Sequence, residues 1–201
     1  MRAGANRTSK GGRRREILEA LAHLLEQSPG EKMTTAGLAA ALGISEAALY
    51  RHFASKAQMY EGLLEFAEES VFERVNRIVA ENSTVAERLE KVLTLVLLFA
   101  ERNPGITRLL TGDVLVGENA RLRTRIQQFF DRLETELRQL LRESALSASQ
   151  SGRLEIPALA ELLVNLASGK MQQYVRSDFK RLPGAQWERQ WGMVRDLVDR
   201  G

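Results

Sequence analysis

Apolar residues recur along most of this chain at the three- and four-residue intervals of helices that bury one face. The longest such segment covers residues 119–146, and its apolar face consists of Leu122, Ile126, Phe129, Leu133, Leu137 and Leu140. A shorter segment over 13–27 shows the same spacing. The alternation of apolar and polar positions that is typical of half-buried strands is sustained nowhere in the sequence. The pattern therefore predicts an all-α protein.

Proline, glycine and capping residues predict where these helices begin and end. Ser55 with Gln58 and Thr84 with Glu87 form two capping boxes, each of which can satisfy free backbone N–H groups at a helix start. The expected helices cover 13–27, 35–42, 45–53, 55–80, 84–103, 105–111, 119–146, 158–177 and 187–199, with a polar loop over 147–153. This order predicts a flexible basic arm over 1–12, a three-helix head over 13–56 and a helical body over 57–201.

The most informative segment is 34–56, where two short helices are expected to be joined by a tight turn at Gly43. Glycine suits the left-handed backbone that ends a helix, and Ser45 can cap the next helix. The residues expected to pack the two helices together are Leu38, Ala39, Leu42, Ile44, Leu49 and Phe53. This pattern is typical of a helix-turn-helix, whose second helix lies in the DNA major groove. An ordinary pair of packed helices shares much of it.

If the second helix of this segment enters a major groove, the chemistry of each side chain suggests its contact. Thr34 and Thr35 open the first helix, where hydroxyls and free N–H groups can hold a phosphate. Glu46 can accept a hydrogen bond from cytosine N4, or it only places a favourable charge at a helix start. The candidate DNA contacts are Arg13, Arg14, Thr34, Thr35, Ser45, Glu46, Ala47, Ala48, Tyr50, Arg51, His52 and Lys56.

The charge of the chain is small but unevenly placed. There are 29 Lys and Arg residues against 26 Asp and Glu residues, a net charge of +3. Residues 1–60 hold nine basic and five acidic residues, so the excess lies in the arm and the head, and the remainder sums to −1. A positive head on a near-neutral body favours a nucleic-acid partner, and the alternative is a solvated basic tail.

Composition excludes several classes of function. The chain has no cysteine, which excludes disulfides, thiol catalysis and cysteine-ligated metals. It has two histidines, His23 and His52, which are too few for most transition-metal sites. No apolar segment approaches the roughly 20 residues of a membrane span, and no apolar core follows the arginines at 13–15 as it would in a signal peptide. We expect a cytoplasmic protein with no cofactor and no enzymatic activity.

The spaced residues of segment 34–56 resemble the DNA-binding signature of the tetracycline-repressor (TetR) family. They are Thr34, Thr35, Leu38, Ala39, Leu42, Gly43, Ile44, Ser45, Leu49, Tyr50, His52, Phe53, Ser55 and Lys56. Matches beyond the head resemble one subgroup of that family, the nucleoid occlusion factors of bacterial cell division. These matches comprise 46–53, Phe66, Arg74, 101–108, 110–112, 175–177 and 179–180.

The resemblance implies a symmetric dimer. Two long C-terminal helices would pair with those of a second copy, and Ala167, Ser168 and Gly169 would allow close approach. Two-fold symmetry places the recognition helices about 34–36 Å apart and predicts a palindromic DNA site, which several dimers could share. The alternative is that these helices form only an intramolecular core.

The resemblance also implies a protein partner. In the subgroup, a groove between the helix that follows the head and the next helix receives the C-terminal tail of FtsZ, the GTPase of the division ring. The positions carried over are Phe66, Arg74, Leu95, Arg102 and Asn103. Apolar anchors flanked by cations suit an extended peptide with acidic and apolar residues. Leu98 departs from the subgroup, which has glycine there, and periodicity alone also fits Phe66 to the core.

The leading hypothesis is therefore a nucleoid-associated inhibitor of division, whose dimers bind chromosomal palindromes and disrupt FtsZ polymers. The alternative is a ligand-responsive transcriptional repressor with the same head, in which an effector shifts the spacing of the two heads. Residues 92–100 are apolar on nearly every side and are expected to be filled core, which leaves little room for an effector.

Overall fold

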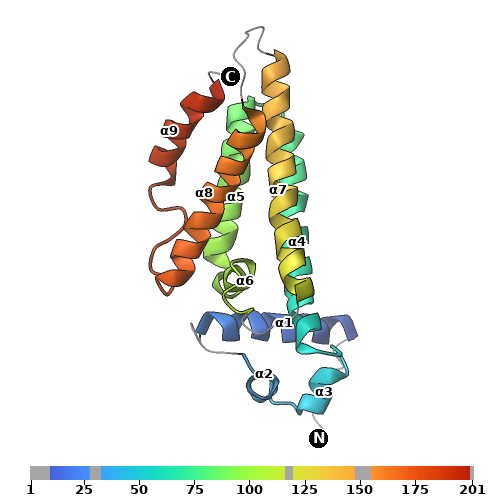
Figure 1. Cartoon of the computed structure of the whole chain (residues 1–201). Coiled ribbons are helices and arrows are strands. Elements are labelled where there is room, and N and C mark those ends of the chain that lie inside the picture. The colour runs from blue at the N-terminus through green and yellow to red at the C-terminus, as the bar shows by residue number, and fades with distance from the viewer. Residues whose placement is uncertain (1–9, 28–32, 116–119, 148–154, 200–201) are drawn as a thin grey trace, which may run out of the picture.

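The computed structural model describes residues 10–27, 33–115, 120–147 and 155–199, and within these ranges it contains nine α-helices and no strand (Figure 1). The helices are α1 (Lys10–Gln27), α2 (Thr35–Ala41), α3 (Glu46–Tyr50), α4 (Lys56–Val79), α5 (Val85–Arg102), α6 (Pro104–Leu110), α7 (Ala120–Ser147), α8 (Ile156–Arg176) and α9 (Trp187–Asp199). The all-α expectation is confirmed for this part of the chain. The expected arm and polar loop lie largely outside it.

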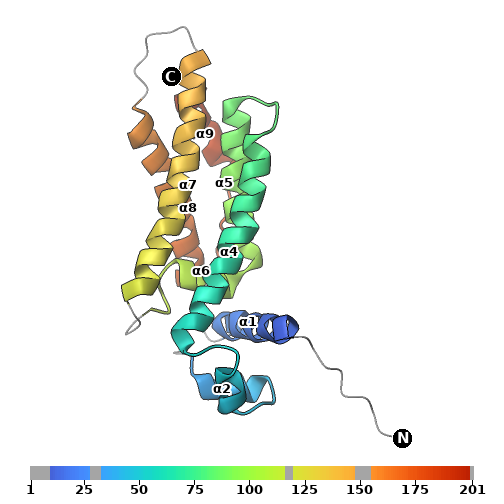
Figure 2. The same ribbon diagram turned by 90° about the vertical axis from the view of Figure 1, so that its right-hand side faces the viewer.

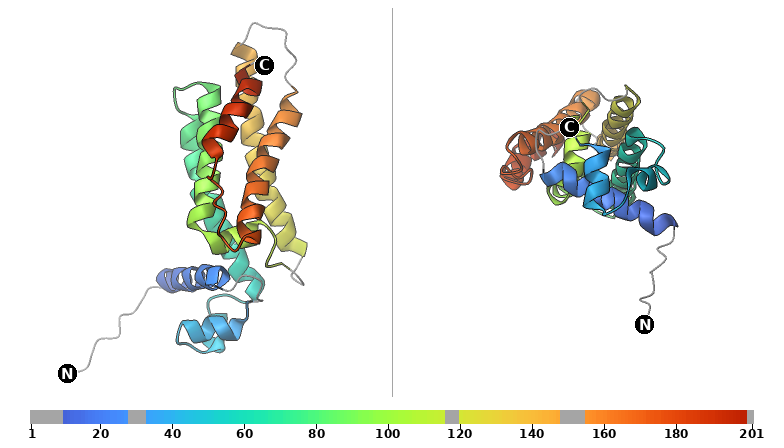
Figure 3. Two further views of the ribbon diagram at one scale, coloured as in Figure 1. Left: turned by 90° about the vertical axis from the view of Figure 1, so that its left-hand side faces the viewer. Right: turned by 90° about the horizontal axis from the view of Figure 1, so that it is seen from below.

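The helices form a small head below an elongated body. In the body the axes of α4, α5, α7 and α8 are roughly aligned, and α9 packs beside α5 (Figures 1 and 2). The first helix crosses beneath the body, and α2 and α3 lie under it. Viewed from below, α1 and α2 cover the lower end of the body (Figure 3). The head is therefore joined to the body through α1, α4 and α6.

Two expected boundaries in the head are wrong. The first helix begins at Lys10, so 10–12 belong to α1 and not to the arm. The helix expected over 45–53 is the five-residue α3, which Ser45 caps and which is followed by a turn at 51–52. This turn redirects the chain into α4, whose N-cap is Ser55. Periodicity detects the apolar contacts of such a short helix but not the bend that ends it.

The core of the body is as expected along α7 but differs on α5. All six residues of the predicted α7 face are buried. On α5, by contrast, the interpretation of 92–100 as filled core is wrong at Leu98, whose surface is 38% exposed. Thr94 and Leu95 are half-buried on α5 as well. Thr94 accepts a hydrogen bond from the Trp187 indole N–H of α9 at 2.7 Å, so Leu98 is the exposed one of these three residues.

The two predicted capping boxes differ in the structure. At the start of α5 the Thr84 hydroxyl accepts from the Glu87 N–H and the Glu87 carboxylate accepts from the Thr84 N–H, which lowers the pKa of Glu87. At the start of α4 the Ser55 hydroxyl accepts from the Gln58 N–H, but the Gln58 side chain accepts from Ala54 instead. In the Ser55 box, the side chain of Gln58 therefore caps the N–H of Ala54 and not that of Ser55 itself.

The head and body meet at a close contact between α1 and α6. A Cβ atom at Gly105 would lie 1.9 Å from the carbonyl oxygen of Ala22, so only glycine lets the two backbones approach this closely. Three residues on, Arg108 is 2% exposed; it donates to the Leu25 carbonyl at 2.8 Å and to Asp113 at 2.7 Å. The Leu25 carbonyl belongs to the last turn of α1, where a cation is favourable.

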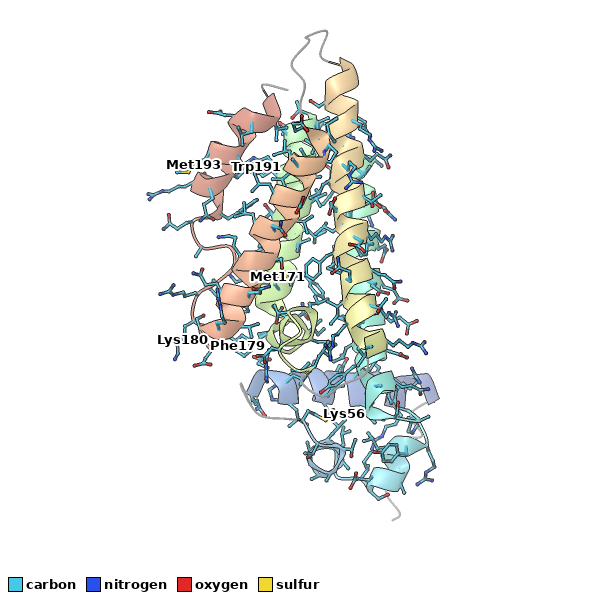
Figure 4. The ribbon with its side chains drawn as sticks, in the orientation of Figure 1. Lys56, Met171, Phe179, Lys180, Trp191 and Met193 are labelled. Atoms are coloured by element: carbon cyan, nitrogen blue, oxygen red, sulfur yellow. The ribbon has the colours of Figure 1, made fainter. Side chains whose placement is uncertain are left out.

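The C-terminal end of α5 is held from the opposite side by α8 and by the connection that joins α8 to α9. The Tyr174 hydroxyl donates to the Glu101 carbonyl at 3.2 Å, and burial, then the Glu101 carboxylate, raises the pKa of Tyr174. The Glu101 carboxylate itself accepts from the Gly184 N–H at 2.5 Å. In Figure 4 the labelled Phe179 and Lys180 mark the lower end of this connection, beside the end of α8. These contacts fix where α5 ends and α6 begins.

The close contact between α1 and α6 predicts a large cost for Gly105→Ala. The new methyl group would overlap the Ala22 backbone, and overpacking costs about 1–3 kcal/mol in the free energy of unfolding. The matched control is Gly192→Ala on α9, where nothing lies within 4 Å of the new Cβ and up to about 1 kcal/mol of stabilisation is expected. Thermal melts at equal protein concentration compare the two, and a neutral Gly105→Ala variant would show that the contact is loose.

Candidate nucleic-acid interface and partner groove

The head contains the capped helix pair that the sequence predicts. The Thr34 hydroxyl accepts from the Gly37 N–H at 3.1 Å, and the Ser45 hydroxyl accepts from the Ala48 N–H at 3.2 Å. Between them Gly43 has a φ of 63°, the left-handed conformation expected for the turn. Each of the two helices therefore begins at a hydroxyl cap.

Three candidate residues meet on the surface that α2 and α3 share. The Thr35 hydroxyl donates to the Glu46 carboxylate at 2.6 Å, and the Tyr50 hydroxyl donates to the Thr35 hydroxyl at 3.4 Å. These bonds fix α3 against α2 and occupy part of the hydrogen-bonding capacity of Glu46. Because all three side chains remain partly or fully exposed, the cluster can still meet a ligand. Its bonds also give Glu46 a structural role.

The other candidates around α3 differ in accessibility. Ser45, Ala47 and Arg51 are exposed, whereas Ala48 is half-buried. Ala47 is thus the better placed of the two alanines for an apolar contact with a base. His52 is half-buried, and its Nδ1 atom has no hydrogen-bond partner within the described residues.

The charged candidates on α1 and α4 make contacts within the chain. Arg14 donates to the His52 carbonyl at 2.9 Å and stacks over the Phe53 ring at 4.1 Å. Arg13 pairs with Glu16 at 2.5 Å. Lys56, labelled at the start of α4 in Figure 4, lies 5.5 Å from the centre of the Tyr60 ring. Arg14 is therefore a residue that positions α1 against the α3–α4 turn, a role that spacing does not reveal.

The five candidate partner residues lie on α4, on α5 and at the residue that follows α5. Phe66 is 48% exposed, so its ring is not core, and Arg74 and Arg102 are exposed too. Leu95 and Asn103 are half-buried. Arg74 donates only to a carbonyl of its own helix, and Arg102 makes no hydrogen bond or ion pair with any described residue. The two cations thus have no carboxylate partner among the described residues.

A pocket of about 710 Å³ brings three of these residues together. Phe66, Arg102 and Asn103 line it, and Asn103 is held by a bond from its side-chain amide to the Phe99 carbonyl at 2.8 Å. Arg74 and Leu95 do not line this pocket. Arg74 lies eight residues beyond Phe66 on α4, about 12 Å along the helix axis. The pocket therefore covers only the part of the candidate set around Phe66 and Arg102, and Arg74 and Leu95 lie outside it.

Metal-binding clusters and membrane-spanning helices are missing from the described residues. These residues contain no group of three or more histidine, aspartate or glutamate side chains that could hold a metal ion. None of their helices is both long and apolar enough to cross a bilayer.

Comparison with solved structures gives the fold. The fatty acid degradation regulator FadR from Bacillus halodurans superposes with a TM-score of 0.78 over 96% of this chain and 98% of its own, at 17% identity. The TetR family regulator PfmR from Thermus thermophilus gives a TM-score of 0.70 over 92% and 97%, at 23% identity. A family model described as bacterial regulatory proteins, tetR family, matches residues 17–63. The head and fold are those of a TetR-type regulator.

Comparison of sequences narrows this class. A model of the tetracyclin repressor-like C-terminal domain, of SlmA-like type, matches residues 82–198. The nucleoid occlusion factor SlmA of Marinomonas sp. (strain MWYL1) is 54% identical over 92% of this chain and 94% of its own length. That of Idiomarina loihiensis is 53% identical over 94% and 96%. The chain belongs to the SlmA family of nucleoid occlusion factors.

The internal contacts of Arg14 predict that Arg14→Met destabilises the head. A hydrogen bond from a charged group contributes about 1.5–3 kcal/mol to the free energy of unfolding, and Arg14→Met removes one. Its neighbour Arg15 is the matched control, because its side chain is 82% exposed and Arg15→Met should change stability by less than about 0.5 kcal/mol. Denaturant titration measures both, and equal effects would contradict the positioning role.

Proposed function

We propose that this chain acts as a nucleoid occlusion factor through two separate surfaces. The α2–α3 surface of the head binds DNA, and the groove along α4 and α5 binds the C-terminal tail of FtsZ. The observation that carries the proposal is the exposed ring of Phe66 in the same pocket as Arg102, a cation without a carboxylate partner among the described residues. Arg74, which is also without a carboxylate partner there, lies about 12 Å farther along α4. Family membership supports the same assignment.

On the head, the exposed side chains suit DNA. Ser45, Ala47 and Arg51 are accessible around α3, and Thr34 and Thr35 open α2. Base contacts would come from the start of α3, with Thr34, Tyr50 and Lys56 at phosphates. Arg14 is left out of this set, since its guanidinium holds His52 and Phe53. Discrimination between DNA sequences would thus depend on the few side chains at the start of α3.

A symmetric dimer would set the length of the DNA site. On α8, Leu162 is 50% exposed, and Asn165 and Gly169 lie on the same exposed stripe with open space at Gly169. Ala167, expected at the interface, is instead buried within the protomer. Pairing two copies through this face of α8 would place two heads on one palindrome, with centres about 34–36 Å apart.

The partner groove suits an extended acidic peptide with apolar anchors. Phe66 and Leu95 supply apolar surface, and Arg74 and Arg102 supply charge near either end. Leu98 lies one turn from both Leu95 and Arg102 on α5, and its exposed side chain would narrow the proposed groove where the subgroup has glycine. Dimers on chromosomal sites would then concentrate this groove over the nucleoid and disrupt FtsZ polymers there.

Thr34→Ala and Arg74→Asp should separate the two activities. Thr34→Ala removes a phosphate ligand and a helix cap that contributes about 0.5–2 kcal/mol, so it should weaken duplex binding about tenfold, whereas Thr34→Ser keeps the hydroxyl and should bind normally. The Arg74→Asp variant should bind the duplex normally. It should no longer reduce the amount of FtsZ polymer that sediments in the presence of GTP.

The control for the filament assay is wild-type protein with and without a cognate duplex. If wild-type protein with DNA leaves the filaments unchanged, the ligand-responsive repressor is the better hypothesis. If Arg74→Asp instead abolishes dimerisation, the groove is misassigned.

The basic arm predicts a salt effect. Deleting residues 1–9, which leaves α1 intact, removes Arg2 and Arg7. Each phosphate that these residues neutralise steepens the slope of log affinity against log salt by about 0.9, so the deletion should flatten the slope equally for specific and random duplexes. Fluorescence anisotropy over a salt series measures it, and an unchanged slope would exclude the arm from DNA binding.

A further inference from the structure

A chain of two hydrogen bonds joins α2 and α3 on the surface of the head. The Thr35 hydroxyl, at the first residue of α2, donates to the carboxylate of Glu46, the first residue of α3, at 2.6 Å. The hydroxyl of Tyr50, the last residue of α3, donates to the Thr35 oxygen at 3.4 Å. Figure 1 shows α2 and α3 next to each other at the lower end of the head. The Glu46 side chain therefore reaches from α3 back to α2.

We propose that Glu46 is a positioning residue for DNA binding, which acts through Thr35 and Tyr50 and does not read a base. Its carboxylate holds the Thr35 hydroxyl, and that hydroxyl in turn places the Tyr50 side chain at the end of α3. The Tyr50 hydroxyl then turns to a phosphate when DNA docks. The inference rests on the proposed function, because it assigns roles within the same DNA-binding surface.

The protons of the two threonine hydroxyls at the start of α2 are used differently. A threonine hydroxyl has one proton to donate and can also accept hydrogen bonds. The Thr34 hydroxyl accepts from the Gly37 N–H, so that bond leaves its proton for a phosphate. The Thr35 hydroxyl, by contrast, gives its proton to Glu46 and accepts from Tyr50. Thr34 is therefore the phosphate ligand of the pair, and Thr35 is the link between α2 and α3.

The two bonds of the chain differ in strength. The distance of 2.6 Å between the Thr35 and Glu46 oxygens is that of a charge-assisted bond, which is about twice as strong as a neutral one. The distance of 3.4 Å from Tyr50 to Thr35 is longer than usual for a hydroxyl donor, and Tyr50 is 45% exposed. The strong bond keeps Thr35 and Glu46 together, and the weak one lets the Tyr50 proton move to a phosphate oxygen.

The direction of the Glu46 side chain argues against a base contact. In a helix-turn-helix the second helix enters the major groove, whereas the first crosses the DNA backbone. A carboxylate bonded to the first residue of α2 is held toward the helix that crosses the backbone. The neighbouring Ser45 and Ala47 are exposed and make no such bond to α2. These two residues are better placed than Glu46 to meet bases.

The position of α3 depends on its contacts with the rest of the head. It has five residues, and an isolated helix in water needs about 12–15 to be even marginally stable. Leu49 is buried and anchors the end of α3, and the bond from Thr35 to Glu46 anchors its start. Loss of that bond would therefore shift all the DNA contacts of α3 together, whatever the DNA sequence.

A double-mutant cycle tests whether Glu46 acts through Thr35. Glu46→Ala and Thr35→Val should each weaken binding to a cognate palindromic duplex about fivefold, and the double variant should be no weaker than either, because each change removes the same bond. The matched control is Glu46→Gln, whose amide oxygen still accepts from Thr35 and which should bind within about twofold of wild type. Fluorescence anisotropy measures the affinities, and thermal melts verify that each variant is folded.

A panel of duplexes separates positioning from base reading. Each base pair of one half-site is changed in turn, and affinity is measured for wild type, Glu46→Ala and Glu46→Gln. Positioning predicts that Glu46→Ala weakens every duplex by the same factor and that both variants keep the wild-type base preferences. A carboxylate that accepts from cytosine N4 predicts instead a loss confined to one C·G pair, or a new preference for adenine in Glu46→Gln. Either of these results would overturn the inference.

The affinities of the single variants distinguish the inference from the proposed function. If Glu46→Ala weakens binding equally with and without Thr35→Val, Glu46 contacts the DNA directly and the inference is wrong. If Glu46→Ala binds normally while Thr34→Ala loses binding, the link to Thr35 is dispensable and the proposed function stands. If Thr34→Ala also binds normally, the α2–α3 surface is not the DNA site, and both the inference and the proposed function fail.

Discussion

The position of the head relative to the body depends on one close contact, that of Gly105 in α6 with the carbonyl oxygen of Ala22 in α1. Arg108 fixes the same junction one turn later through the Leu25 carbonyl. Pro104 and Asn103 precede the contact directly and line the pocket with Phe66 and Arg102. The residues that hold the head are therefore continuous with the candidate partner site. One short corner between α5 and α6 thus sets the geometry of both candidate surfaces.

Ion pairs between helices distinguish the structural cations of the body from cations that make no such pair. Arg88 and Arg125 each pair with a carboxylate of another helix, and the Glu68 carboxylate raises the pKa of Arg125. Arg74 and Arg102 have no such carboxylate within the described residues. Because pairing satisfies the former, only cations of the second kind, to which Arg74 and Arg102 belong, keep their charge available. The small net charge of the chain conceals this division.

Long amphipathic helices and their caps could be predicted from the sequence, because they depend on neighbouring residues. The α7 face and the Thr84 capping box are examples. The role of Arg14 in positioning α1 could not be predicted from the sequence. It depends on the carbonyl of His52, which is 38 residues away and is brought near only by tertiary packing. The contribution of α1 to the pocket that Phe66 and Arg102 line could not be predicted either, because only tertiary packing brings α1 near α4. Resemblance located Phe66 and Arg102, and the structure shows that both are exposed.

The proposed function requires one dimer to hold DNA and the FtsZ tail at the same time, on surfaces that do not overlap. Sedimentation velocity of a labelled palindromic duplex with the protein and a differently labelled tail peptide measures this directly. We predict that both labels sediment together in one complex whose peptide content reaches one per protomer. Displacement of the protein from the duplex by saturating peptide, or peptide left entirely in the slow fraction, would contradict the account.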